Sequence, residues 1–258
     1  MSRSLEIDSY EKKPPPILAK IPHFFELFSK MNDIIDEKYS KSSAQFFQFR
    51  RAIQRKMQLL HLIKSRYLDS ADLVKKGLNT AKRKLELYTT ADPNVLQEAS
   101  EFSERWLLAR RSLVLDLESF LMFSRVVLDH VPWMLQPCLK EYVAHEEPEI
   151  VDFQHFCEWF RDNPDKVKDE EFRSFLLHFY SWFLANLGNP HNDLVIHSKR
   201  TYTLDSISPN GQVIRFKYDR VGLEDSIEER FELPSPVVSF QKIYDFLIDL
   251  EDYFLKIL

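Results

Sequence analysis

Glycine is scarce in this chain of 258 residues, and its four glycines, Gly77, Gly188, Gly211 and Gly222, each stand alone. Phosphate-binding loops and dinucleotide fingerprints need several glycines within a few positions, because the backbone must approach the phosphate closely. The sequence therefore excludes the common nucleotide-dependent enzymes that are built on such loops.

Cysteine is rarer still, and Cys138 and Cys157 form no Cys-x-x-Cys pair. Zinc knuckles and disulfide frameworks need more thiols at closer spacing. Both thiols are expected to be small buried groups in a reducing compartment. No metal site and no cofactor is expected.

Long uncharged apolar runs are also missing. The most apolar stretch, residues 107–131, is expected to be a buried helix rather than a membrane span, since it carries six charged side chains: Arg110, Arg111, Asp116, Glu118, Arg125 and Asp129. The first 16 residues are polar, end in three prolines and do not have the form of a signal peptide. The sequence predicts a cytoplasmic protein with no membrane association.

Charge is unevenly divided along the chain, whose net charge is -5. Residues 50–84 contain eleven Lys or Arg and two acids, whereas residues 141–171 contain eleven acids and three Lys or Arg. Such segregation suits a nucleic-acid-binding face, or two charged faces that pair within the fold or across a dimer. Pairing and solvation are the commoner outcome for surface charges.

Hydrophobic side chains make up 44% of the chain, enough for one large core, and many recur at three- and four-residue steps. We expect an all-α fold, an antiparallel bundle of about five to seven helices with a small β-hairpin inserted before the last helix. Residues 1–40 should form an arm and a short helix, and residues 41–258 the bundle domain. The pattern predicts helices over residues 21–39, 46–67, 72–88, 95–131, 153–161, 170–187 and 238–258, with a break or kink at Asp69-Ser70 and a helix end at Pro132.

A helix end and a helix start are predicted close together near residue 190. Gly188 suits the C-terminal cap of one helix, Asn189 the N-terminal cap of the next and Pro190 its first residue. His191 and Asn192 would then lie in a first helical turn. Free backbone amides and the helix dipole allow such a turn to hold a phosphate.

A second histidine, His197, follows six residues later. On a helix this spacing separates the two rings by about 120° and about 9 Å along the axis, so they are not expected to share a metal ion. Asp193 and His197 are four apart and share a face, so the carboxylate could orient the imidazole as an acid or base. Alternatively, Asp193 is only an acid at a helix start and His197 a structural histidine.

The segment after His197 alternates polar and apolar residues around Asn210-Gly211, which predicts a β-hairpin over about residues 199–219. Lys199 and Arg200 add positive charge beside the histidines. The alternative is an exposed hairpin whose charges are only solvated.

The order of these elements resembles the HEPN superfamily of helical-bundle proteins. The likeness lies in two long helices, an aromatic helix, a turn with His191, Asn192 and His197, a small hairpin and a final helix containing residues 243–251. Members of that superfamily often carry an Arg-Asn pair a few residues before a His. Many are metal-independent RNases whose site forms at a homodimer interface. Asn192 and His197 match this motif, and His191 stands in place of the arginine.

The resemblance implies a homodimeric endoribonuclease of toxin or defence type. His197, His191 and Asn192 would be catalytic and Asp193 orienting, while the RNA-binding residues would be Lys199, Arg200, Arg50, Arg51 and Arg55. A histidine at a helix N-terminus is disfavoured as a cation, so it replaces arginine poorly. Because charge stabilisation is commonly the largest catalytic effect, the substitution favours a weak or inactive nuclease.

Two alternatives belong to other functional classes. One is a non-catalytic bundle of the same layout, which binds RNA or a protein partner through the basic side of residues 50–84. The other is a purely structural homodimer subunit, in which aromatic side chains of residues 172–183 and 240–254 cover an apolar patch by pairing with a second copy.

Overall fold

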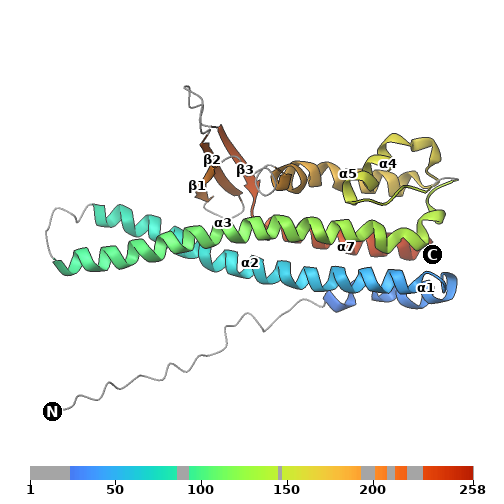
Figure 1. The fold of residues 1–258 in the computed structure, drawn as a ribbon, viewed down its shortest axis with the longest axis horizontal. Coiled ribbons are helices and arrows are strands. Elements are labelled where there is room, and N and C mark those ends of the chain that lie inside the picture. Colours follow the sequence, from blue (N-terminus) through green and yellow to red (C-terminus); the bar gives the residue numbers. More distant parts are fainter. Residues whose placement is uncertain are drawn as a thin grey trace, which may run out of the picture.

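Two long antiparallel helices form the frame of the molecule (Figure 1). The structure is a computed structural model that describes residues 24–85, 93–144, 147–192, 201–207, 213–219 and 229–257. Helices α2 (Ser43–Leu85) and α3 (Pro93–Leu135) contain 43 residues each and are therefore about 64 Å long. The apolar stripe predicted for the first of them is buried, with Phe46, Ile53, Met57 and Leu60 fully covered. The predicted helical bundle is confirmed.

Both long helices continue through positions where breaks were expected. The break at Asp69-Ser70 is wrong, because Ala71 and Val74 are buried and carry the core stripe of α2 onward. Helix α3 likewise passes through Pro132 to Leu135. A proline inside a helix costs about 3 kcal/mol. Burial of its neighbours, at about 1.5–3 kcal/mol for each large side chain, offsets that cost; Val131, Met134 and Leu135 are all fully covered.

The N-terminal segment forms short turns rather than the single helix expected over residues 21–39. It consists of η2 (Phe24–Glu26), η3 (Ser29–Met31) and α1 (Asn32–Lys38). Phe28 lies between the two 3₁₀ turns with a φ of 59°, in the left-handed region, so a straight helix cannot pass through it. Its side chain is fully buried, and the Gln54 amide of α2 donates to the Leu27 carbonyl at 3.0 Å.

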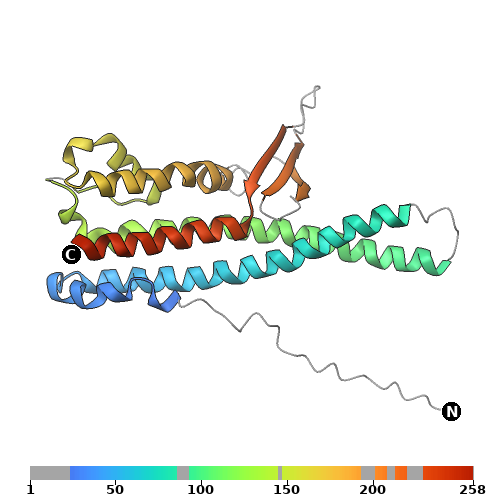
Figure 2. The same cartoon turned by 180° about the vertical axis from the view of Figure 1, so that it is seen from behind.

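The remaining helices lie in layers on the frame. After η4 (Gln136–Glu141) come α4 (Phe153–Asp162), η5 (Pro164–Lys166) and α5 (Glu170–Phe183), and α7 (Pro236–Ile257) ends the chain. Figures 1 and 2 show α1 and α2 in one layer, α3 and α7 in the next, and α4 and α5 in a third. The third layer packs through aromatic rings, with Phe179 of α5 stacked on Phe246 of α7 at 3.8 Å between centroids.

A small antiparallel sheet precedes α7. Strands β1 (Thr201–Ile207) and β2 (Val213–Asp219) pair as the predicted hairpin, and β3 (Glu229–Pro234) adds an unexpected third strand beside β2. Ile214 pairs with Leu233, and both are buried as part of the main core. Figure 2 shows β3 leading directly into the start of α7.

The two cysteines are buried and unpaired, as predicted. Burial raises the pKa of Cys138 to about 12, so its thiol stays protonated at neutral pH and is a poor nucleophile. In the described parts of the chain, no helix combines the length and apolarity that crossing a bilayer requires.

Candidate functional site

The backbone around His191 differs from the expected helix stop. Helix α5 continues through a π-helical turn, η6 (Leu184–Gly188), into α6 (Asn189–His191). Gly188 and Asn189 have φ of -64° and -62° and ψ of -60° and -48°, all in the right-handed helical region. Both residues therefore continue the helix, and the predicted break at Gly188 and new start at Pro190 are wrong.

Two backbone amides next to His191, those of Asn189 and Asn192, are therefore not free to hold a phosphate. The amide of Asn189 donates to the Leu184 carbonyl, and the amide of Asn192 donates to the Asn189 carbonyl. The first bond spans five residues, as is typical of a π turn. The expected phosphate-binding helix N-terminus is absent at His191 and Asn192, because the helix that begins at Glu170 runs up to them without a new start. Single π turns occur frequently at functional sites, so the π turn is consistent with a functional role for the side chains around it.

The His191 side chain is mostly covered, with 7% of the residue exposed. Burial lowers the pKa of His191, and the nearby charge of Arg125 lowers it further. A hydrogen bond with Asn192 raises the pKa, but the net shift is downward. Its Nδ1 lies 3.5 Å from Asn192 Oδ1. The ring is therefore neutral at pH 7, as the sequence suggested, but because of burial rather than a helix N-terminus.

An arginine from a distant helix stands next to this pair. Arg125 of α3 donates from Nη1 to Asn192 Oδ1 at 2.9 Å. Its other nitrogens face two carboxylates, Asp152 Oδ2 at 3.4 Å and Asp129 Oδ2 at 3.8 Å. The Arg125 side chain is 19% exposed, so it reaches solvent while it joins α3, α4 and α6. A permanent cation thus lies beside Asn192, although the sequence motif lacks its arginine.

Asp152 links Arg125 to a second histidine. It caps the N-terminus of α4, because its Oδ1 accepts the backbone amide of His155 at 2.8 Å. The same oxygen lies 2.8 Å from Nδ1 of the His155 ring, and the ring itself is 59% exposed. The hydrogen bond to Asp152 and its charge raise the pKa of His155. The carboxylate orients an exposed imidazole and favours its protonated form.

A second carboxylate, Asp129, closes the cluster from α3. It accepts the backbone amide of Phe153 at 3.0 Å and lies beside Arg125. Burial raises the pKa of Asp129, and this effect exceeds the opposing influence of the Phe153 amide and of Arg125. We refer to Arg125, Asp129, Asp152, His155, His191 and Asn192 as the Arg125 cluster.

The Arg125 cluster holds the groups needed for acid and base chemistry on a phosphate. An exposed imidazole whose pKa is raised, a guanidinium and a buried imidazole whose pKa is lowered follow one another from α4 through α3 to α6. Arg125 acts on the pKa of both His155 and His191, so its charge lies within electrostatic reach of both rings. No group of three or more His, Cys, Asp or Glu residues suited to a metal ion occurs in the portion of the chain that is described.

Four of the residues predicted for the site, Asp193, His197, Lys199 and Arg200, lie outside the described residues, in 193–200. The basic residues of α2 are described. Arg51 and Arg55 are exposed and line a surface groove of about 510 Å³. Arg50 instead turns inward, donates to Asn32 Oδ1 and lies over the Phe47 ring, and burial lowers its pKa. Of the three arginines, Arg51 and Arg55 are thus exposed and Arg50 is half-buried.

The sequence contained weak signals for the residues that were missed. Arg125 and Asp129 are charges within the most apolar stretch of the chain, where burying an unpaired charge is costly, so partners had to exist. Asp152 stands three residues before His155 at a helix start, the usual spacing for a capping carboxylate. No local pattern indicates that these residues meet Asn192, which is 67 positions from Arg125.

Comparison with known proteins found no match to this chain among family models, curated proteins or solved structures. The likeness to the HEPN superfamily thus stays a prediction, which rests on the order of the elements and on Asn192 and His197.

Proposed function

We propose that this chain acts on RNA as a metal-independent endoribonuclease of HEPN-like layout. The observation that supports this proposal is the hydrogen bond from Arg125 to Asn192 beside His191. In the motif that the sequence resembles, an arginine precedes the asparagine and holds the negative charge of the phosphorane. Arg125 would supply that charge from α3.

The role of His155 follows from its raised pKa, and the role of His197 follows from its place in the motif. His155, whose pKa is raised, suits the general acid that donates a proton to the 5′ oxygen when its bond to phosphorus breaks. A neutral histidine suits the base that removes the proton of the ribose 2′-hydroxyl as its oxygen attacks phosphorus. His197 stands at the motif position of that base, and Asn192 would position the phosphate. The products are a 2′,3′-cyclic phosphate and a free 5′-hydroxyl.

The carboxylates around Arg125 set an upper limit on the rate. Asp129 and Asp152 already share the guanidinium, so a phosphate must compete with two negative charges for it. A single donor to the transition state is worth about 100- to 1000-fold in rate. We therefore propose slow cleavage.

A cleavage assay with mixed RNA in the presence of a metal chelator tests the proposal. The wild-type protein should produce 2′,3′-cyclic phosphate ends. R125K, H155A and H197A should each lower the rate by about 100-fold or more, because lysine cannot reproduce the planar fork of arginine. H178A changes an exposed histidine on α5 and is the matched control. Thermal unfolding of each variant separates lost chemistry from lost folding.

If H197A and R125K cleaved RNA as fast as the wild type does, another group in the protein or a contaminant would be responsible for the cleavage. No cleavage by folded wild-type protein would remove the enzyme proposal and leave the non-catalytic one.

The non-catalytic candidate is an RNA-binding bundle whose contact face is the groove beside Arg51 and Arg55. It is favoured by the exposure of these two guanidinium groups, four residues apart on one face of α2. Binding through phosphates should weaken steeply with salt, and R51E/R55E should abolish it. R105E/R111E reverses the same amount of exposed charge on α3 and serves as control. Equal loss in both double variants would refute a defined groove.

A further inference from the structure

A cavity of about 570 Å³ lies at the end of the bundle where the α1–α2 connection meets η4. Three lysines line it: Lys38 at the end of α1, Lys41 in the α1–α2 connection and Lys140 in η4. It is built from elements other than those of the Arg125 cluster, so it is a separate site.

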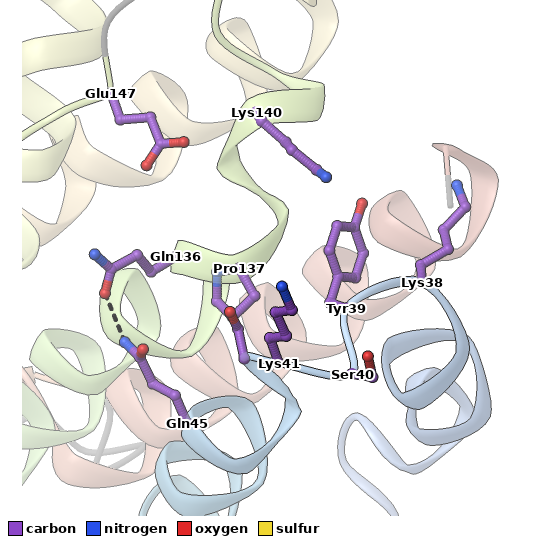
Figure 3. A pocket seen from close by; sticks show the side chains of 10 residues that line it. Lys38, Tyr39, Ser40, Lys41, Gln45, Gln136, Pro137, Lys140 and Glu147 are labelled. Atoms are coloured by element: carbon purple, nitrogen blue, oxygen red, sulfur yellow. Dashed lines mark hydrogen bonds between the residues drawn. The ribbon is translucent and has the colours of Figure 1, made fainter.

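Positive charge predominates in this cavity. Against the three ammonium groups stands one lining carboxylate, Glu147, which points in from the opposite side (Figure 3). All three lysines are exposed, and none forms an ion pair with any other residue that the structure describes. The nearby Glu141 carboxylate accepts the Tyr39 hydroxyl at 2.8 Å. In a chain of net charge -5, three such unpaired cations around one hollow favour an anion.

The walls of the cavity are fixed by contacts between its two sides. Gln45 of α2 donates from Nε2 to Gln136 Oε1 at 2.6 Å and to the Trp133 carbonyl at 3.2 Å, which joins α2 to the end of α3 and to η4 (Figure 3). The Lys140 ammonium lies 4.8 Å from the centre of the Tyr39 ring, and Tyr39 is itself only 7% exposed. This cation–π contact holds one of the charges at the wall.

The start of α2 adds to the positive potential. Residues 40–42 line the cavity and lead into Ser43, the first residue of a helix of 43 residues. The dipole of a helix places partial positive charge at this end. The lysines and the start of α2 therefore both make the electrostatic potential in the cavity more positive.

We propose that this cavity binds a small phosphate-bearing anion with several negative charges, such as the triphosphate group of a nucleotide or inorganic triphosphate. Lysine ammonium groups bind phosphate as compact point charges. The volume falls within the range of about 300–1000 Å³ that is usual for small-molecule sites. Because glycine-rich loops are absent from the sequence, the side chains rather than the backbone would hold the phosphates.

Titration calorimetry of the full chain at low salt, with inorganic triphosphate and separately with a nucleoside triphosphate, tests this site. The triple variant K38Q/K41Q/K140Q should weaken binding of either anion by at least about tenfold. The control K75Q/K242Q/K256Q removes the same charge at positions outside the cavity and should bind as the wild type does. Equal affinity for the two anions would show that the site recognises the phosphate groups alone. Tighter binding of the nucleotide would show that the base or the sugar also contacts the protein.

Equal weakening in the two triple variants would overturn the proposal, since binding would then follow net charge rather than the cavity. Failure of the wild type to bind either anion at low salt would also overturn it. The three lysines are exposed, so the variants should retain the thermal unfolding of the wild type. RNA cleavage by the Arg125 cluster is measured separately, so the two proposals can fail independently.

Discussion

At the residue scale, Asp152 connects three functions through one carboxylate. It caps α4, holds the His155 ring and contacts Arg125. Burial alone would raise the pKa of Asp152, but the hydrogen bonds from His155 and the charge of Arg125 outweigh it, and the net shift is downward. The charge of Asp152 in turn raises the pKa of His155.

Replacing Asp152 with Asn should lower the pKa of His155 toward its ordinary value of about 6.5. Asn retains the capping function, so the helix start is preserved. The folded-state pKa of His155 exceeds the unfolded value, so the stabilisation from the pair is complete below about pH 6.5 and disappears as pH rises through the raised pKa. NMR titration of the His155 ring and urea unfolding of D152N and wild type at several pH values measure both effects.

The matched control is D162N, which removes an exposed carboxylate from the other end of α4. It should leave the titration of His155 unchanged. A His155 pKa that does not move in D152N would contradict the assigned hydrogen bond.

Some members of the candidate site could be predicted from the sequence, and others could not. His191 and Asn192 were found because they are close to each other and to a glycine and a proline in the chain. Arg125 was visible only as a charge in an apolar helix, because the contact that matters is long-range and depends on how α3 and α6 pack. Burial of His191, which makes its ring neutral, is likewise a property of packing.

At the element scale, α2 and α3 meet in a contact that requires glycine. A Cβ atom at Gly77 would lie 2.1 Å from Cδ1 of Trp106 in α3, well inside van der Waals distance. The Trp106 ring is also held by the Arg110 guanidinium, which lies 5.3 Å from its centre. The frame therefore depends on an indole packed directly against the backbone of the facing helix.

Gly77→Ala should lower the free energy of unfolding by about 1–3 kcal/mol, because overpacking exceeds the gain of up to about 1 kcal/mol in helix propensity. In the Trp106→Ala background the same change should be neutral or stabilising, since the indole is gone. Urea unfolding of the four proteins forms a double-mutant cycle. An equal effect of Gly77→Ala in both backgrounds would show that the contact is not the cause.

The fold was largely predictable at this scale, and the wrongly predicted helix breaks share one cause. The helical periodicity located α2, α3, α4, α5 and α7, because each buries one apolar stripe. The local propensities at Asp69-Ser70, Pro132 and Gly188-Pro190 oppose helix and predict breaks there. Burial of the neighbouring side chains outweighs those propensities, so the helices continue.

At the scale of the whole molecule, the exposed apolar side chains gather on the long helices. Leu108, Leu115 and Met122 of α3 are spaced seven residues apart and are 61%, 57% and 40% exposed. The aromatic side chains that suggested dimerisation from sequence pack on each other instead, as Phe175 does on Tyr253. If the protein is the predicted homodimer, the leucines of α3 are the better candidates for its interface.

L108E/L115E should therefore convert a dimer to a single 30.8 kDa species in sedimentation at micromolar concentration. Charged side chains within an apolar stripe whose members are seven residues apart oppose the pairing of two helices. The control V151E alters a side chain of 55% exposure that lies outside the two long helices, and it should remain dimeric. A wild-type protein that sediments only as the 30.8 kDa species would contradict the homodimer prediction.

The π turn at Leu184–Gly188 has a consequence for how the site tolerates change in the length of the chain. A π turn holds one residue more than the α turn it replaces, so it takes up the extra residue and keeps the helical phase of the residues that follow, which an insertion into an α turn would rotate by about 100° around the helix axis. That phase directs the Asn192 side chain to Arg125. Deleting one residue between 184 and 188 should let the turn close as an ordinary α turn with Asn192 still facing Arg125, whereas inserting one residue between 188 and 192 would leave every member of the Arg125 cluster in the sequence and still turn Asn192 away. Residue identity sets the chemistry of this site, and residue count sets its assembly.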